Sequence, residues 1–439
     1  MDASVRHQPF RAAIAAFLGT MIEWYDFYCY GTAAALVFGE VFFATDDPFL
    51  STLASLGTFA VGFIARPFGA LIFGHLGDKI GRKKSLIITL LLMGSATTLI
   101  GLIPGYKSIG FAAAVLLVTL RLIQGIAVGG EWGGAVLIAS EHAPAKWRTI
   151  IASAPQYGSP VGLILATLVF RAVSSLPEAD YHSWGWRIPF LISGLLVVLA
   201  FIIRRTVEES PELQKRKAAG HISDVAPVRL LLRSHKKALL LGISFCMLGI
   251  SGFYFVTTLM ITYTTTYLKV SKPDILDIIA WTGVVELVAY PVGSFLAHKF
   301  GERKFLLLVT GGAVLWALPM MQLVASGDLR NITIAILVAT AIIGSYYAVL
   351  SAYLPRAFPV EMRYTGISLS FQLCGAIFGG TTPLIGLWIA KTWPAQWLPL
   401  GIMFLVITGA TFVATVFLPT QESRKGAHLG PESESLSSL

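Results

Sequence analysis

The chain has little charge for its size. Asp, Glu, Lys and Arg make up only 13% of its 439 residues, whereas soluble domains carry about 25%. Hydrophobic residues reach 55%, and the mean hydropathy is +0.72. This composition excludes a soluble globular protein and favours an integral membrane protein that crosses the bilayer many times.

Cysteine is scarce as well, and so are the motifs of enzymes. Cys29, Cys246 and Cys374 lie in apolar segments and form no CxxC pattern, so neither a disulfide framework nor a metal site is predicted. The sequence has no GxxxxGK[ST] loop for a nucleotide phosphate. No Ser/His/Asp order or zinc-spaced cluster stands out either. We therefore predict that the protein is not an enzyme and that it uses no cofactor.

Long apolar segments dominate what is present. Each is long enough to cross a bilayer, which takes about 20 residues in a helix. Short loops connect them, except for one polar linker near the middle of the chain. The pattern predicts an all-α integral membrane protein with twelve transmembrane helices. The segments are 12–38, 51–76, 85–103, 110–139, 150–171, 186–204, 238–267, 275–297, 305–325, 331–354, 364–391 and 396–418.

Basic residues predict the orientation. With an even number of spans both termini lie on one side, and most of the Lys and Arg residues outside the spans fall on that side. The positive-inside rule then places both termini and the linker in the cytoplasm. Two basic clusters of the linker, Lys215–Lys217 and Lys236–Lys237, are predicted to lie beside anionic membrane lipid. The net charge of +9 therefore indicates membrane topology, and no nucleic-acid partner is expected.

The two halves of the chain repeat two landmarks in the same order. Gly74–Lys83 joins spans 2 and 3, and Lys299–Lys304 joins spans 8 and 9. Pro144–Arg148 follows span 4, and Pro359–Arg363 follows span 10. Such a repeat predicts two six-helix bundles with a binding site between them at mid-depth. The predicted domains are an N-terminal bundle (1–204), a cytoplasmic linker (205–237), a C-terminal bundle (238–419) and a disordered cytoplasmic tail (420–439).

Several of these segments resemble a known family. Gly74–Lys83 is similar to the signature loop of the major facilitator superfamily. Glu23–Phe27, Arg66–Gly69, Gly129–Gly134 and Trp184–Phe190 resemble the metabolite:proton symporter branch, which includes shikimate, α-ketoglutarate, citrate and proline/betaine carriers. The resemblance covers nearly the whole chain without specifying a substrate. It implies alternating access by two bundles, driven by the proton gradient.

Charged residues inside the spans are the first candidates for function. A charge at the bilayer centre costs about 2.5–3.5 kcal/mol on insertion scales, so these side chains should face protein or a cavity. Arg121, Gln124 and Glu131 share one stripe of span 4. Asp26 of span 1 is expected at the depth of Arg121, and we predict that the two pair and that substrate displaces Asp26. The predicted proton-coupling acids are Asp26, Glu23 and Glu131.

The remaining site predictions fall into three groups. The predicted substrate contacts, of which Glu286 is expected to tune substrate choice, are Arg121, Gln124, Tyr30, Gln156, Tyr157, Glu286 and Gln372. The predicted cytoplasmic gate, which holds the bundles together on that side, is Asp78, Gly81, Arg82 and Arg148. For Arg66 and His298 both a structural and a functional role stay open.

The second half departs from the family pattern at its own gate. His298 and Glu302 stand where the family usually has Asp and a basic residue, and Arg356 stands where an acid is common. These departures put in doubt a second charge lock equal to the first. The sequence alone therefore predicts one strong lock, in the first half of the chain.

We predict a monomeric secondary transporter of the bacterial inner membrane. Its partners are a small polar metabolite, a proton and membrane lipid, and Arg121 favours a carboxylate-bearing organic acid. Two alternatives stay open: a symporter for a zwitterionic osmolyte such as betaine or proline, and a receptor built on a transporter fold. Export by antiport and coupling to Na⁺ in place of H⁺ stay open as well.

Overall fold

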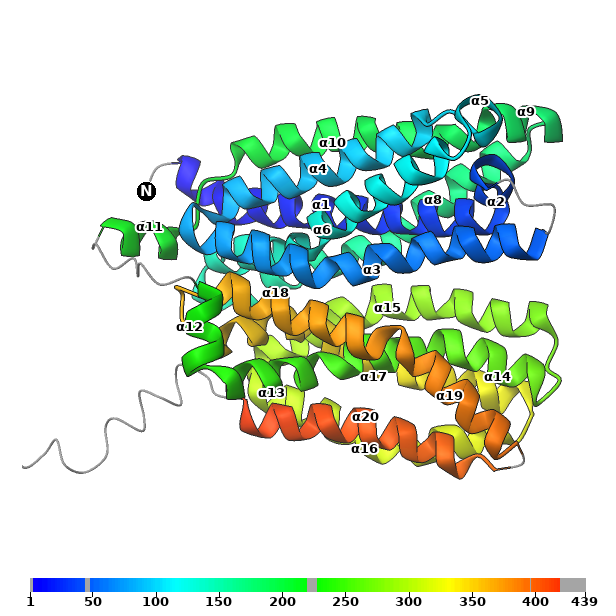
Figure 1. Ribbon diagram of the computed structural model, residues 1–439. Coiled ribbons are helices and arrows are strands. Elements are labelled where there is room, and N and C mark those ends of the chain that lie inside the picture. The colour runs from blue at the N-terminus through cyan, green and yellow to red at the C-terminus, as the bar shows by residue number, and fades with distance from the viewer. Residues whose placement is uncertain (1–2, 44–47, 219–226, 395, 419–439) are drawn as a thin grey trace, which may run out of the picture.

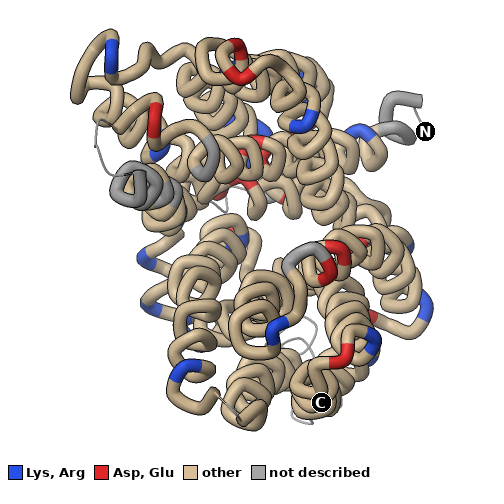
Figure 2. The backbone as a smooth tube through the Cα atoms, turned by 90° about the vertical axis from the view of Figure 1, so that its right-hand side faces the viewer, with Lys and Arg blue, Asp and Glu red and all other residues tan. Residues whose placement is uncertain are grey.

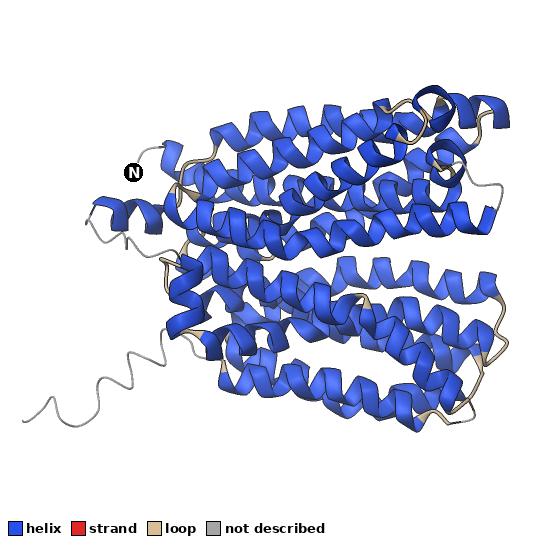
Figure 3. Ribbon diagram, in the orientation of Figure 1, coloured by secondary structure: helices blue, strands red, loops and turns tan. Residues whose placement is uncertain are grey.

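The computed structural model describes residues 3–43, 48–218, 227–394 and 396–418. Throughout these residues the chain is helical and contains no strand (Figure 3). A long helix, continuous or in consecutive pieces, covers each segment that the sequence predicts to span the membrane. Eleven of the described helices are long and apolar enough to cross a bilayer. The other predicted span is α1 (Ala3–Leu36), which packs against the other long helices of the same bundle.

Two bundles lie side by side along their length (Figure 1). The first bundle contains α1, α3 (Pro48–Lys79), α4 (Arg82–Leu102), α6 (Ala112–His142), α8 (Gly158–Ser174) and α10 (Ile188–Thr206). Its connecting pieces are α2 (Phe38–Phe42), α5 (Tyr106–Ile109), η1 (Ala145–Trp147), α7 (Arg148–Ala152), η2 (Ala154–Tyr157), α9 (Glu178–Ser183) and η3 (Gly185–Arg187). Viewed along the helices, charged residues are sparse in both bundles (Figure 2).

The second bundle contains more broken helices than the first. Its long helices are α15 (Lys272–Phe300), α16 (Glu302–Ala325), α17 (Leu329–Tyr353) and α20 (Leu398–Phe417). One interrupted span is α13 (Lys236–Met247), η4 (Leu248–Gly252), η5 (Phe255–Leu259) and α14 (Met260–Thr266). The other is α18 (Arg363–Cys374), η7 (Gly375–Gly379) and α19 (Thr381–Thr392), with η6 (Leu354–Ala357) preceding it. The π-helical pieces η4, η5 and η7 widen the turn, as π-bulges often do at functional sites.

One end of the molecule carries the pieces that connect the bundles. α11 (Pro211–Ala218) and α12 (Pro227–Ser234) lie there, α1 begins there and α20 ends there (Figure 1). We call this the linker end and the opposite one the far end. Contacts between the bundles concentrate at the linker end, where α18 packs on α3 and α6 and α7 packs on α15 and α17.

Glycines let α3 and α6 approach at backbone distance. A Cβ added at Gly125 would meet the carbonyl of Gly62, and one added at Gly129 would meet the carbonyl of Arg66. Small residues at a helix interface allow this close packing in a membrane, where apolar burial drives association only weakly. The glycine-rich stretch of α6 thus acts as the packing face that the sequence predicts.

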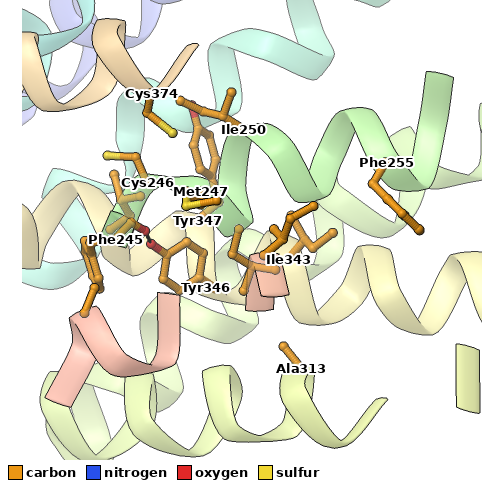
Figure 4. Packing of buried hydrophobic residues seen from close by; sticks show 14 of the residues in the cluster. Phe245, Cys246, Met247, Ile250, Phe255, Ala313, Ile343, Tyr346, Tyr347 and Cys374 are labelled. Atoms are coloured by element: carbon orange, nitrogen blue, oxygen red, sulfur yellow. Dashed lines mark hydrogen bonds between the residues drawn. The ribbon is translucent and has the colours of Figure 1, made fainter. Parts of the chain in front are cut away.

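The second bundle is held by large apolar and aromatic side chains. The ring of Phe255 stacks on Phe404 with centroids 4.6 Å apart, and the Tyr346 hydroxyl donates to the carbonyl of Phe245. Figure 4 shows the surrounding side chains, among them the free cysteines Cys246 and Cys374. This packing covers one side of η4, whose residues Gly249 and Ile250 face the cavity on the other.

The repeat extends to backbone geometry. Gly81 precedes α4 with φ 138°, and Gly301 precedes α16 with φ 91°. Glycine adopts such positive φ values without the penalty that a Cβ incurs. The same turn therefore occurs at corresponding places of both halves.

The predicted domain boundaries remain predictions. Residues 219–226 of the predicted linker and the predicted disordered tail, 420–439, lie outside the described residues, as do the side chains of Lys215–Lys217.

Candidate functional site

A cavity lies between the bundles and draws its lining from both. Its empty volume is about 840 Å³, which includes space that opens to solvent. Apolar and aromatic side chains make up most of the wall, with a few polar groups among them, as in many small-molecule sites. The polar lining residues are Glu23, Arg66, Ser159, Tyr254, Glu286, Tyr290, Tyr347 and Gln372.

The first bundle contributes a cation and an acid to this wall. The Arg66 guanidinium of α3 lies 4.5 Å from the ring centre of Phe63 and 5.4 Å from that of Phe27. Within the described part of the chain, no carboxylate lies at ion-pair distance from Arg66. Glu23 of α1 is only 7% exposed, and its Oε2 has no hydrogen-bond partner among the residues that the structure describes. Glu23 and Arg66 interact electrostatically. Because Arg66 forms no ion pair and Glu23 Oε2 accepts no hydrogen bond within the described residues, both side chains can still bind a ligand.

The second bundle contributes an acid, an amide and three tyrosines. Glu286 of α15 is 8% exposed, and Gln372 of α18 is 3% exposed. Tyr290 lies one turn beyond Glu286, and its ring meets that of Tyr157 from the first bundle at 5.7 Å. Of the predicted substrate contacts, Glu286 and Gln372 therefore line the cavity. Tyr157 does not line it but packs against the lining residue Tyr290.

An aromatic stack beside the cavity joins the two bundles. Trp132 of α6 stacks on Phe371 of α18 with centroids 4.0 Å apart. The Trp132 indole donates to Gln156 Oε1 at 3.2 Å, and Gln156 Nε2 donates to the carbonyl of Tyr347 at 3.1 Å. Gln156, a predicted substrate contact, is thus engaged in holding the bundles together.

Asp26 and Arg121 lie inside the first bundle and are not among the residues that line the cavity. Arg121 donates to Gln124 Oε1, Gln124 Nε2 donates to Thr97 Oγ1 at 2.7 Å, and Thr97 donates to Asp26 Oδ2 at 2.7 Å. The Arg121 guanidinium also lies 4.0 Å from the ring centre of Tyr30. The structure therefore connects the predicted pair through two intervening side chains, and it places Arg121, Gln124 and Tyr30 in one buried polar network.

Glu131 has a cationic partner that the sequence analysis did not name. Arg204, near the end of α10, forms a two-pronged ion pair with Glu131 and donates to the carbonyl of Leu86 at 2.6 Å. Thr89 donates a further bond of 2.6 Å to Glu131. Glu131 is fully buried and Arg204 is 3% exposed. The predicted proton-coupling acid Glu131 is therefore bound within the first bundle, away from the cavity.

At the linker end, Asp78 ties the first bundle to the start of α18. Its carboxylate accepts from the backbone N–H groups of Tyr364 at 3.1 Å and Thr365 at 3.0 Å, and from the Thr365 hydroxyl at 2.8 Å. These N–H groups lack partners inside the helix, so an acid at a helix N-terminus satisfies them and complements the helix dipole. Arg82 pairs with Asp78 at 2.9 Å and donates to the carbonyl of Val360 at 2.9 Å.

The corresponding arginines of the two repeats converge on the linker. Arg363 binds Glu212 of α11 at 2.5 Å and Glu141 of α6 at 3.1 Å. Arg148 approaches Glu212 at 3.9 Å. Ser210 donates to Glu141. The predicted gate residues Asp78, Arg82 and Arg148 thus lie in one charged layer that joins both bundles and the linker.

The departures in the second half turn out to be partners. Arg356 pairs with Glu302 at 2.8 Å, and Glu302 accepts from Thr149 of the first bundle at 2.5 Å. His298 stacks on Trp147 of the first bundle, with ring centres 5.3 Å apart. Glu302 and Arg356 each carry the charge opposite to the one that the family usually has there, and they pair within the second bundle. The contacts of Glu302 with Thr149 and of His298 with Trp147 form a second link between the bundles.

Sequence reasoning missed several of these contacts for identifiable reasons. Arg204 is the last residue of the predicted span 186–204 and was not singled out as a candidate. Glu141 was not singled out, and Arg363 was noted only as part of the repeated landmark Pro359–Arg363. The repeat contained a usable signal, since Arg148 and Arg363 occupy equivalent positions and bind the same linker acid.

These features describe a membrane transporter with a cavity between two bundles and a closed layer at one end. Residues 12–219 match a family model described as sugar (and other) transporter. An inner membrane metabolite transport protein of Escherichia coli (strain K12) is 36% identical over 421 residues, covering 94% of each chain. The shikimate transporter of the same strain is 36% identical over 419 residues, covering 94% of this chain and 95% of its own length.

A citrate-proton symporter of Salmonella typhi is 32% identical over 423 residues, which cover 95% of this chain and 96% of the relative. The solved structure of a proton:xylose symporter bound to 6-bromo-6-deoxy-D-glucose superposes with a TM-score of 0.72, covering 94% and 97% of the two chains. That structure is 18% identical, so its likeness is one of fold. The chain belongs to the major facilitator superfamily, in its metabolite:proton symporter branch, and this family consists of transporters and not of enzymes.

Proposed function

We propose that the protein is a symporter that couples the inward flow of protons to the uptake of a carboxylate-bearing metabolite. It works by alternating access across the bacterial inner membrane. The observation that carries the proposal is the wall formed by Arg66 and Glu23. As far as the described residues go, a cation without an ion-pair partner and an acid without a full set of hydrogen bonds share one cavity between the bundles.

Arg66 is the proposed anchor for the substrate carboxylate. A guanidinium presents parallel N–H donors that match a carboxylate, and it stays charged inside a protein. The Phe63 and Phe27 rings hold the guanidinium from the side without using its hydrogen-bonding edge. This role differs from the sequence-based prediction, which gave it to Arg121.

Glu23 is the proposed proton carrier. In the empty cavity the positive charge of Arg66 acts on Glu23. A substrate carboxylate on Arg66 offsets that charge, and a buried acid without a compensating cation binds a proton readily. The other charges that act on Glu23 are Asp26, Glu131 and Arg204, of which the last two already pair with each other. Substrate and proton are then bound together.

The charged layer at the linker end is the proposed cytoplasmic gate. The positive-inside rule places this end in the cytoplasm, so the structure with its layer closed faces outward. Moving the bundles apart there breaks the contacts of Asp78 and Glu302 and opens the opposite path. Water then enters the cavity, restores Glu23 to its charged form and releases both substrate and proton inside.

Two experiments test the proposal in sequence. First, a thermal-shift screen of the purified protein with organic acids, betaine and proline identifies ligands, since a molecule that binds only the native state raises its stability. Second, uptake of the labelled ligand is measured in proteoliposomes with an inward proton gradient, an inward Na⁺ gradient or none. We expect accumulation only with the proton gradient and its loss on adding a protonophore. Binding without accumulation would instead indicate a receptor, and betaine or proline as sole ligands would indicate an osmolyte carrier.

A further inference from the structure

Three charged side chains line the cavity: Glu23 and Arg66 on the first bundle and Glu286 on the second. The first two act on each other and balance in charge. Glu286 stands on the opposite wall, so the proposed coupling steps leave it unused. Its presence is the remaining chemical feature of the cavity that needs an explanation.

The neighbours of Glu286 are tyrosines. Tyr290 lies one turn along α15, lines the cavity with Glu286 and donates a hydrogen bond to it, which leaves room for further donors. Tyr28 of α1 interacts with Glu286 electrostatically from the first bundle. Among the described residues no Lys, Arg or His pairs with Glu286. A carboxylate buried inside a membrane without a cation is costly. Its free energy falls when a hydrogen-bond donor reaches it.

We infer that Glu286 binds the end of the substrate opposite to the carboxylate and that this end carries hydroxyl or ammonium donors. The inference rests on the proposed function, because it takes the carboxylate to lie at Arg66. The cargo is then a hydroxylated or aminated carboxylate, and a plain carboxylate of the same skeleton is a poor ligand.

The positions of Arg66 and Glu286 also imply strong discrimination between donor-bearing and plain carboxylates. Arg66 belongs to one bundle and Glu286 to the other, so only a molecule with both kinds of group contacts both walls. A plain carboxylate covers Glu286 and takes away its water without providing a donor. Sites built around a buried polar group reject ligands that leave it unpaired far better than apolar pockets reject an extra methylene.

Matched carboxylates provide the test. The purified protein is titrated with butyrate, 4-hydroxybutyrate and 4-aminobutyrate, which carry hydrogen, hydroxyl and ammonium at the end opposite the carboxylate, and with cyclohexanecarboxylate and its tetrahydroxy counterpart quinate. The readout is the ratio of dissociation constants within each set, from thermal shifts. For the wild type we expect the donor-bearing member of at least one set to bind about ten- to a hundredfold tighter, as a hydrogen bond to a charged group implies.

Three variants assign that preference. Glu286→Ala should bring the ratio close to one while plain carboxylates still bind. Glu286→Gln keeps an acceptor oxygen without the charge, so a preference for hydroxyl should survive in part and a preference for ammonium should be lost. Asp277→Asn removes an exposed acid from the same helix and should leave all ratios at wild-type values.

The outcomes separate this inference from the proposed function. A wild-type ratio near one in every set, or an unchanged ratio in Glu286→Ala, overturns the inference. The same holds if Glu286→Ala keeps the ratio but lowers the number of protons moved per substrate, which would make Glu286 a second proton site. Equal binding of all carboxylates by Arg66→Ala and the wild type would instead overturn the proposed carboxylate anchor.

Discussion

The two bundles share a repeat but divide the work differently. At membrane depth the first bundle carries several charges that are buried, namely Glu23, Asp26, Arg121, Glu131 and Arg204, and the half-buried Arg66. The second bundle has Glu286 at comparable depth and is otherwise filled by an aromatic and aliphatic core (Figure 4). It also contains the π-helical pieces η4, η5 and η7.

The difference suggests that the first bundle supplies most of the charged groups and the second supplies a cavity wall that can change shape. Gly249, Ile250, Gly375 and Ala376 line the cavity from the π-helical pieces of the second bundle. Hydrogen bonds in such pieces are less regular than in an α-helix, so these segments change shape at lower cost. The ionic networks of the first bundle hold its helices in fixed relation. The predictions below test this division, from the largest expected effect to the smallest.

Breaking the buried ion pair of the first bundle should have the largest effect on stability. Arg204→Leu leaves Glu131 buried without its cation, which typically costs about 3–5 kcal/mol. The double variant Glu131→Leu/Arg204→Leu should be less destabilised than Arg204→Leu alone, because no charge remains unpaired. Thermal unfolding in detergent measures both. If the stability lost by the double variant equals the sum of the losses in Glu131→Leu and Arg204→Leu, the two residues contribute independently and do not act as a pair.

Removing the cavity cation should have the largest effect on ligand binding. Arg66→Ala should weaken carboxylate binding about a hundredfold, equivalent to roughly 3 kcal/mol. Arg66→Lys should recover little, because an ammonium lacks the planar pair of donors. Arg171→Ala, at an exposed arginine of α8, is the control. Titration by thermal shift checks all three, and wild-type affinity in Arg66→Ala would assign the anchor to another residue such as Arg121.

The two gates compare the bundles directly. Asp78→Asn weakens the cap of α18 and its pair with Arg82, so we expect a shift of about 1–3 kcal/mol toward the state open at the linker end. Glu302→Gln should shift it by less than about 1 kcal/mol, because the contact of Glu302 with the first bundle is a hydrogen bond from Thr149, which the amide oxygen of Gln can still accept. Cysteine labelling from either side reports the populations. Equal shifts in both variants would contradict the ranking of the gates.

The smallest effect is expected at His298. Its ring stacks on Trp147, and such a pair contributes about 0.5–1.5 kcal/mol. His298→Phe keeps the stack, so the transport rate should stay within about twofold of the wild type at every pH. A pH profile of uptake distinguishes the two roles that the sequence left open. A profile that changes shape in His298→Phe would indicate a pH sensor in place of a structural stack.

The sequence predicted the helices well because lipid imposes a strong rule: a spanning segment needs a long apolar run whatever its neighbours are. It also identified Glu23, Arg66, Glu286 and Gln372 as polar groups in apolar helices. The rotation of each helix about its axis is set by packing partners, which no single segment contains. For this reason the sequence did not separate Arg66, which lines the cavity, from Arg121, which lies in a buried network.

Pairs between distant segments were the second limit. Glu302 and Arg356 were recognised separately as departures from the family pattern, and each by itself indicated a weakened gate. Their contact at 2.8 Å shows that one change compensates the other. A reversed charge in one loop was thus a reason to look for a reversed charge in the other, since the repeat brings the two loops to the same end.

The central claim is that the proton is carried by Glu23 in the cavity, and one uptake measurement tests it most directly. Glu23→Gln and Asp26→Asn are reconstituted in proteoliposomes and supplied with labelled substrate and an inward proton gradient. Both changes remove one buried acid of α1, so each serves as the control for the other. The account predicts that Glu23→Gln still exchanges substrate but no longer accumulates it, while Asp26→Asn accumulates it. Gradient-driven accumulation by Glu23→Gln, with its loss in Asp26→Asn, would contradict the account and assign the proton to the buried network of Asp26 and Arg121.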